Sequence, residues 1–116
     1  GAILTAIGTS LVANDDLSFR VTNGAPNQPF LLLQGATSVA LPFKDGILCM
    51  GNPTRRLEVV YMDAAGTGAT IESVVTNGAV LPGQTRHYQA WYRDPLSPSP
   101  CTARSNLTQA LELAWI

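Results

Sequence analysis

The sequence predicts an all-β domain, a two-sheet antiparallel β-sandwich of immunoglobulin-like or jelly-roll-like type. Turn-forming residues recur roughly every 8–12 positions, and the stretches between them are short and rich in β-branched and aromatic residues. Helical patterning is poor, because the one candidate, residues 105–113, has apolar residues at a period of two. A chain of 116 residues fits a single domain, residues 1–116, without an internal linker or repeat.

Two strands are expected in the first third of the chain. Residues 2–9 are apolar and β-branched, and residues 14–16 should form a turn because Asn and Asp side chains bond the local backbone. Leu17, Phe19 and Val21 then alternate with polar residues. This period of two is typical of a strand with one face in a core and the other in water.

Four short apolar stretches follow, separated by glycine and proline. They are residues 30–34, 39–43, 47–50 and 55–62, with a turn expected at residues 44–46. Pro42 favours an edge strand or a bulge for the second stretch. In the fourth stretch, Leu57, Val59 and Tyr61 are expected to share one face.

The last third is predicted to add three strands. Residues 69–76 form the first, and Asn77-Gly78 is the strongest short turn signal in the chain. An aromatic strand follows within residues 84–95, and residues 107–116 form the last strand. In that last strand Leu111, Leu113 and Trp115 are expected on one face.

The composition indicates an extracellular domain. Only 13% of the residues are charged, against about 25% in a typical soluble domain, and there is one lysine. A net charge of −1 gives no electrostatic basis for binding nucleic acid, and no apolar run reaches the ~20 residues that insertion into a membrane requires. We interpret the chain as a secreted or cell-surface module of a longer precursor, whose other domains are expected partners.

The two cysteines, Cys49 and Cys101, lie 52 positions apart. They lack neighbouring His or Cys ligands, so they do not form a standard zinc site. In an oxidising compartment one disulfide is the natural interpretation, and it would stabilise the fold by roughly 4 kcal/mol in the chain-entropy model. Two free, buried cysteines are the alternative.

Catalytic patterns are missing from the sequence. The chain has one histidine, His87, and contains no nucleophile elbow, zinc-protease, P-loop or dinucleotide-binding motif. We therefore expect a protein that is not an enzyme and needs no cofactor. Asn14, Asp15 and Asp16 are weak candidates for calcium, which takes oxygen ligands, although three adjacent polar residues more often make a solvated turn.

The aromatic strand is the main candidate for a binding site. Alternation places Tyr88, Ala90 and Tyr92 on one face and His87, Gln89, Trp91 and Arg93 on the other. If the tyrosines are buried, Trp91 lies outside among polar groups, an arrangement suited to sugar binding. If Trp91 is buried instead, the stretch is simply core, which is the commoner position for so large a ring.

Several segments resemble the C-terminal or repeated modules of large secreted proteins in planctomycetes and myxobacterial-type bacteria. The matching segments are residues 12–17, 42–49, 56–57, 88–95 and 101–111. The chain departs from the pattern at Gly51-Asn52-Pro53, where more glycine is expected, and in its longer proline run before Cys101. The resemblance implies a secreted β-rich module with Cys49 and Cys101 paired, and it brings no established activity.

These observations lead to two functional hypotheses. The first is a non-catalytic extracellular accessory module that binds glycan, polysaccharide or another cell-surface polymer, with Trp91, Gln89, Arg93 and His87 as the binding residues. The second is a structural, sorting or anchoring module of a large secreted protein, without a site for a small ligand. Solvent exposure of Trp91 discriminates between them.

Overall fold

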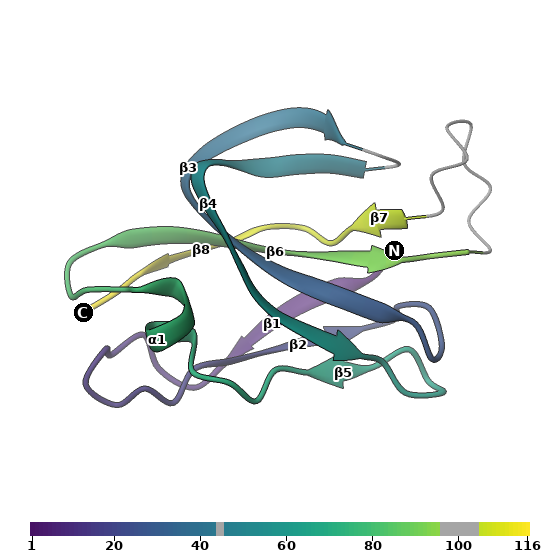
Figure 1. Cartoon of the computed structure of the whole chain (residues 1–116), viewed down its shortest axis with the longest axis horizontal. Coiled ribbons are helices and arrows are strands. Elements are labelled where there is room, and N and C mark those ends of the chain that lie inside the picture. The colour runs from purple at the N-terminus through teal and green to yellow at the C-terminus, as the bar shows by residue number, and fades with distance from the viewer. Residues whose placement is uncertain (44–45, 96–104) are drawn as a thin grey trace.

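The chain folds into two antiparallel β-sheets, as predicted (Figure 1). This computed structural model describes the backbone of residues 1–43, 46–95 and 105–116, and the side chains of residues 1–37, 54–95 and 106–116. The elements are β1 (Ile3–Ile7), β2 (Ser18–Thr22), β3 (Pro29–Phe43), β4 (Gly46–Tyr61), β5 (Gly68–Ala69), α1 (Val74–Gly78), β6 (Thr85–Arg93), β7 (Ser105–Leu107) and β8 (Leu111–Ala114).

The smaller sheet has the order β1-β2-β5, and the larger has the order β4-β3-β6-β7, with β8 also paired to β6. Every described strand pair is antiparallel. None of the helices in the described residues has the length and apolar character needed to span a bilayer. The two antiparallel sheets and the single short helix among the described residues confirm the all-β, two-sheet prediction.

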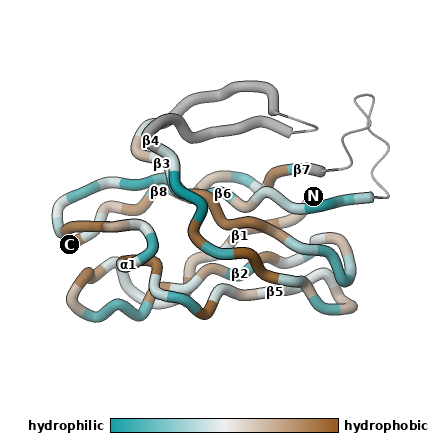
Figure 2. Tube along the Cα trace, viewed as in Figure 1, coloured by the Kyte–Doolittle hydropathy of each residue, from teal (hydrophilic) through white to brown (hydrophobic). Residues whose placement is uncertain are grey.

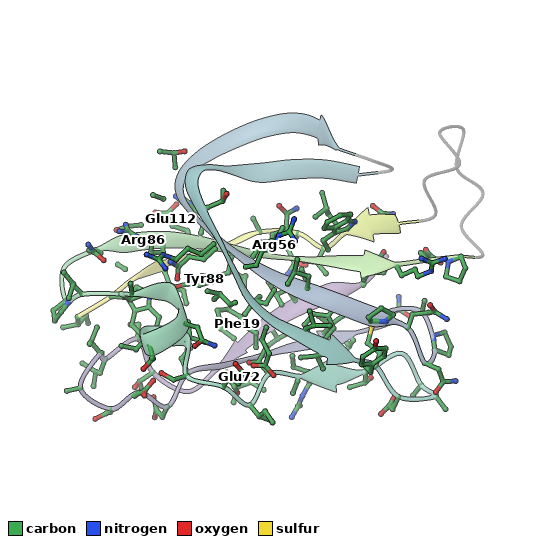
Figure 3. All side chains as sticks on the ribbon, in the orientation of Figure 1. Phe19, Arg56, Glu72, Arg86, Tyr88 and Glu112 are labelled. Carbon is green, nitrogen blue, oxygen red and sulfur yellow. The ribbon has the colours of Figure 1, made fainter. Side chains whose placement is uncertain are left out.

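The core lies between the two sheets. Phe19 and Val21 of β2 are fully buried, as their alternation predicts, and face the inner side chains of β3 and β6. The rings of Phe19 and Tyr88 meet across the sandwich with their centroids 4.7 Å apart (Figure 3). In Figure 2 the most hydrophobic stretches of the chain run through the middle of the molecule, where β3 and β4 cross.

The four short strands predicted between residues 30 and 62 are wrong as separate elements, because they merge into two long ones, β3 and β4. The pairing of β3 with β4 contains three register shifts, which accommodate the residues at which the sequence pattern predicts the end of a strand. Pro53 is tolerated because β4 is an edge strand in the sheet order, where a ladder donor is not needed. Of the turn predicted at residues 44–46, positions 44 and 45 lie outside the described residues.

The prediction that Leu57, Val59 and Tyr61 share a face is also wrong. Leu32 pairs with Glu58 but Leu33 pairs with Arg56, so Leu57 is the extra residue of a β-bulge. The bulge turns Leu57 into the core, where it is 7% exposed, whereas Val59 and Tyr61 are 59% and 74% exposed.

The strand predicted at residues 69–76 is wrong beyond Ala69, because the chain forms the short helix α1 there. Ser73 caps this helix, accepting a hydrogen bond from the Thr76 N–H at 2.9 Å. The Glu58 carboxylate accepts bonds from the backbone N–H groups of Ile71 and Glu72, which ties the chain to the side chain of a β4 residue just before the cap. The predicted Asn77-Gly78 turn is the last part of this helix.

The final strand is divided into β7 and β8 by residues 108–110. The Thr108 hydroxyl accepts a hydrogen bond from the Ala90 N–H at 3.0 Å and donates one to the Gln109 carbonyl. The Gln109 side chain then bridges the two sheets, since its amide accepts from the Leu4 N–H and donates to the Leu4 carbonyl. This interruption thus covers part of the free edge of β1, a position that would otherwise invite pairing with another chain.

Candidate functional site

The aromatic strand β6 turns its tyrosine face toward the core. Tyr88 and Ala90 are fully buried and Tyr92 is 3% exposed. Trp91 is therefore on the outward face of the larger sheet, where it is half-buried. Of the two arrangements that the sequence allows, the one with buried tyrosines is formed.

A chain of buried hydrogen bonds fixes this orientation. The indole N–H of Trp115 donates to the Tyr88 hydroxyl at 3.0 Å, and that hydroxyl donates to Gln34 Oε1 at 2.8 Å. Gln34 Nε2 then donates to the carbonyl of Gly78 at 2.9 Å. A Cβ at position 78 would overlap the Gln34 amide, so a larger residue there would displace that amide from its hydrogen bonds. Burial raises the pKa of Tyr88 to about 12, so its hydroxyl remains protonated near neutral pH.

On the outward face, Trp91 belongs to a transverse row of apolar side chains, here called the outward row. Val59, Leu31, Trp91 and Leu107 are neighbours in register across β4, β3, β6 and β7. Directly opposed residues in adjacent antiparallel strands point to the same face of the sheet. Val59 is exposed and the other three are half-buried. Sequence reasoning missed the partners of Trp91, because strand register cannot be read from local patterning.

The long β3–β4 hairpin borders this face. β4 approaches β6 and β7 as well as its neighbour β3, although β3 and β6 separate it from β7 in the sheet order. Figure 1 shows the hairpin bending sharply and turning back along the sheet. The inner face is occupied by the smaller sheet, so this approach takes place across the outward side.

The other predicted binding residues differ in accessibility. Arg93 is exposed, and His87 is half-buried between its strand partners Gly35 and Glu112. Gln89 is only 1% exposed, and its Nε2 donates to the Thr108 carbonyl at 2.7 Å. The structure thus places Trp91, His87 and Arg93 on the outward face, where Arg93 is exposed and the other two are half-buried, and commits the amide of Gln89 to the join between β7 and β8.

The three calcium candidates form a turn whose side chains have separate partners. Asp16 Oδ1 accepts from the hydroxyl and the N–H of Thr9 at 2.7 and 3.1 Å, and the hydroxyl bond is the main reason that the pKa of Asp16 is lowered. Asp15 accepts from the Ser73 hydroxyl through both carboxylate oxygens, which ties the turn to α1. Asn14 donates its amide to the Thr9 hydroxyl. In the part of the chain that the structure describes, no group of three His, Cys, Asp or Glu side chains is placed to hold a metal.

The cysteine pairing stays a prediction. Cys49 lies in β4, but its side chain is outside the described ranges, and so is the whole of Cys101.

No protein-family model, no curated protein and no solved structure matches this chain. The resemblance to modules of large secreted bacterial proteins therefore also stays a prediction.

Proposed function

We propose that this protein is a non-catalytic extracellular accessory module that binds glycan or another surface polymer through the outward face of β6. The observation that carries the proposal is the orientation of this strand. Since Tyr88 and Tyr92 fill the core, Trp91 is presented on the opposite face, next to the exposed side chain of Arg93.

The residues of this face suit a carbohydrate polymer. A flat indole ring packs against the apolar face of a pyranose, while guanidinium and imidazole groups bond to its hydroxyls. Tyr61 offers a second exposed ring on the same face. Two strand spacings and two residues of rise separate Tyr61 from Trp91, a distance of about 12 Å. That separation corresponds to more than one sugar unit, which favours a chain over a monosaccharide.

The proposal includes the extracellular setting. It is supported by the low charge content of the chain, and it adds a Cys49–Cys101 disulfide in an immunoglobulin-like or jelly-roll-like sandwich as part of what is proposed. Mass measurement with and without reduction tests the pairing, because a disulfide adds two hydrogens on reduction. An unchanged mass would remove the strongest argument for an oxidising compartment.

The alternative is a structural or anchoring module that packs against another domain of the same precursor. The aliphatic members of the outward row, Val59 above all, support this alternative, because such side chains offer no hydrogen bond to a sugar. It predicts that no polysaccharide is bound.

Affinity electrophoresis in gels that contain single soluble polysaccharides tests the proposal. We expect at least one polysaccharide to retard the wild-type chain, and Trp91→Ala to weaken that retardation about tenfold or more. Leu81→Ala is the matched control, since it removes an exposed apolar side chain from the loop before β6 and should migrate like wild type. Equal retardation of Trp91→Ala and wild type would exclude this face as the site.

A further inference from the structure

The chain contains two Asn-Gly pairs, Asn23-Gly24 and Asn77-Gly78. Such pairs are chemically labile, because glycine has no side chain to hinder its backbone nitrogen from attacking the asparagine amide. The attack expels ammonia and ends in aspartate or isoaspartate. Both pairs share this chemistry, but Asn23 lies in an exposed loop after β2, whereas Asn77 lies in α1.

The side-chain amide of Asn77 fastens α1 to β4. Its Nδ2 donates to the Leu57 carbonyl at 3.1 Å and to Glu72 Oε1 at 2.9 Å. The carbonyl of Gly78 is held as well, because it accepts from Gln34 Nε2 at 2.9 Å. Closing a five-membered ring from the Gly78 nitrogen to Asn77 Cγ needs a ψ angle at Asn77 that an α-helix does not allow. The pair is therefore protected while α1 is formed and docked.

The helix α1 is too short to be stable by itself. It has five residues, Val74–Gly78, against the roughly 12–15 that an isolated helix needs even for marginal stability, and three of the five are β-branched. Its stability comes from its contacts. Ser73 caps it and donates to Asp15 at 2.8 Å, Val74 is buried, and the Asn77 amide reaches β4. Local opening of α1 should therefore require less free energy than unfolding of the sandwich.

We propose that Asn77 is a deamidation site whose reaction is controlled by the opening of α1, and whose product keeps α1 open. In the open segment the Gly78 N–H loses its proton to hydroxide, and the nitrogen bonds to Asn77 Cγ. The Cγ–Nδ2 bond breaks as Nδ2 takes a proton from water and leaves as ammonia. Water then adds to one of the two ring carbonyls and a ring C–N bond breaks, which gives aspartate or isoaspartate. No atom is oxidised or reduced, so water is the only co-reactant.

The product cannot restore the contact between α1 and β4. An ionised aspartate at position 77 only accepts hydrogen bonds, so it cannot donate to the Leu57 carbonyl or to Glu72. Its negative charge would lie beside the Glu72 carboxylate, to which the amide now donates, and the two charges would repel. At position 23 the same change removes one exposed bond of 3.3 Å to the Gly1 carbonyl.

Peptide mapping by mass spectrometry follows both sites during incubation of the whole chain in mildly alkaline buffer, with and without urea. In urea, Asn23 and Asn77 should convert at similar rates, because glycine follows both. Without urea, Asn77 should convert at least about tenfold more slowly than in urea. Equal rates of Asn77 in the two conditions would show that α1 does not protect this pair, and the proposal would be overturned.

Removing the helix cap tests the role of opening. Ser73→Ala, which deletes the cap and the bond to Asp15, should raise the rate at Asn77 in buffer about fivefold and leave the rate in urea unchanged. Ser18→Ala serves as the control, since it removes a hydroxyl from β2 and should leave the rate at Asn77 at the wild-type value. A rate in Ser73→Ala equal to that of wild type would contradict control by α1.

Hydrogen exchange measures the effect of the product. Asn77→Asp should speed exchange of the Thr76 and Val80 amides, which donate to Ser73 Oγ and the Val75 carbonyl, about tenfold or more. Asn23→Asp adds the same charge before the other glycine and should leave both amides unchanged. If Asn77→Asp also left them unchanged, the product would not open the helix, and this part of the proposal would fail.

Discussion

Replacing Tyr88 with phenylalanine tests the buried hydrogen-bond chain that sets the orientation of β6. The substitution keeps the ring, and with it the contact to Phe19 at 4.7 Å. It removes only the hydroxyl, which accepts from Trp115 and donates to Gln34. The effect should therefore report the hydrogen bonds rather than the packing.

The magnitude follows from what is left behind. The Trp115 N–H and Gln34 Oε1 would each lose a partner, and these residues are 2% and 3% exposed. A buried polar group without a partner costs roughly 1–3 kcal/mol, so losing a partner at both groups should lower the free energy of unfolding by about 2–6 kcal/mol. That loss is a large part of the roughly 5–15 kcal/mol that stabilises a typical domain.

Urea denaturation, followed by circular dichroism, measures this loss. Tyr61→Phe is the matched control, because Tyr61 is 74% exposed and should change the free energy of unfolding by less than about 0.5 kcal/mol. If Tyr88→Phe also stayed within that limit, the hydrogen-bond chain would not be a determinant of the fold, and the reasoning would be refuted.

Two further outcomes concern pH and the edge of β1. Tyr88 has a pKa of about 12 in the folded chain against 10.0 when exposed, so the unfolded chain loses this proton first as pH rises. The contribution of Tyr88 to stability should be unchanged below pH 10 and fall by on the order of 2–3 kcal/mol between pH 10 and 12. When urea midpoints are compared across pH, Tyr88→Phe should lose less stability than wild type in this range by that amount. Gln109→Ala should remove both bonds to the Leu4 backbone and speed hydrogen exchange of the Leu4 amide, while the exchange of Phe19 in β2 stays slow. Unchanged protection of Leu4 would show that Gln109 does not hold this edge.

The local alternation of apolar and polar residues correctly predicted which side chains are buried in strands without a bulge. Phe19 and Val21 are buried as their period of two indicates, and Leu111, Leu113 and Trp115 are more buried than the residues between them. Where the outcome depends on a distant partner, local patterning fails. Leu57 turns inward because of a bulge opposite Leu32 and Leu33, which no local signal announces.

The helix α1 was missed for a similar reason. Its β-branched residues Val74, Val75 and Thr76 favour a strand by propensity. The carboxylate of Glu58, more than a dozen positions earlier, instead holds the chain at Ile71 and Glu72 and leads it into the Ser73 cap. Tertiary contacts thus outweigh intrinsic preference in this segment.

The candidate site was predictable in part. Alternation alone assigned Trp91 and Arg93 to one face, but only the structure shows that this face is the outward one. The buried Gln89 amide donates to the Thr108 carbonyl, and Thr108 belongs to residues 108–110, which separate β7 from β8. Sequence patterning gave no sign of this contact.

Tryptophan fluorescence during titration with a polysaccharide panel tests the central claim most directly. Trp115 is 2% exposed and hydrogen-bonded to Tyr88, so it should not respond to a ligand, whereas Trp91 lies on the outward face. We predict that at least one polysaccharide changes the emission of the wild-type chain and leaves that of Trp91→Phe unchanged. An unresponsive wild type, or an equal response from Trp91→Phe, would contradict the proposed role of this face.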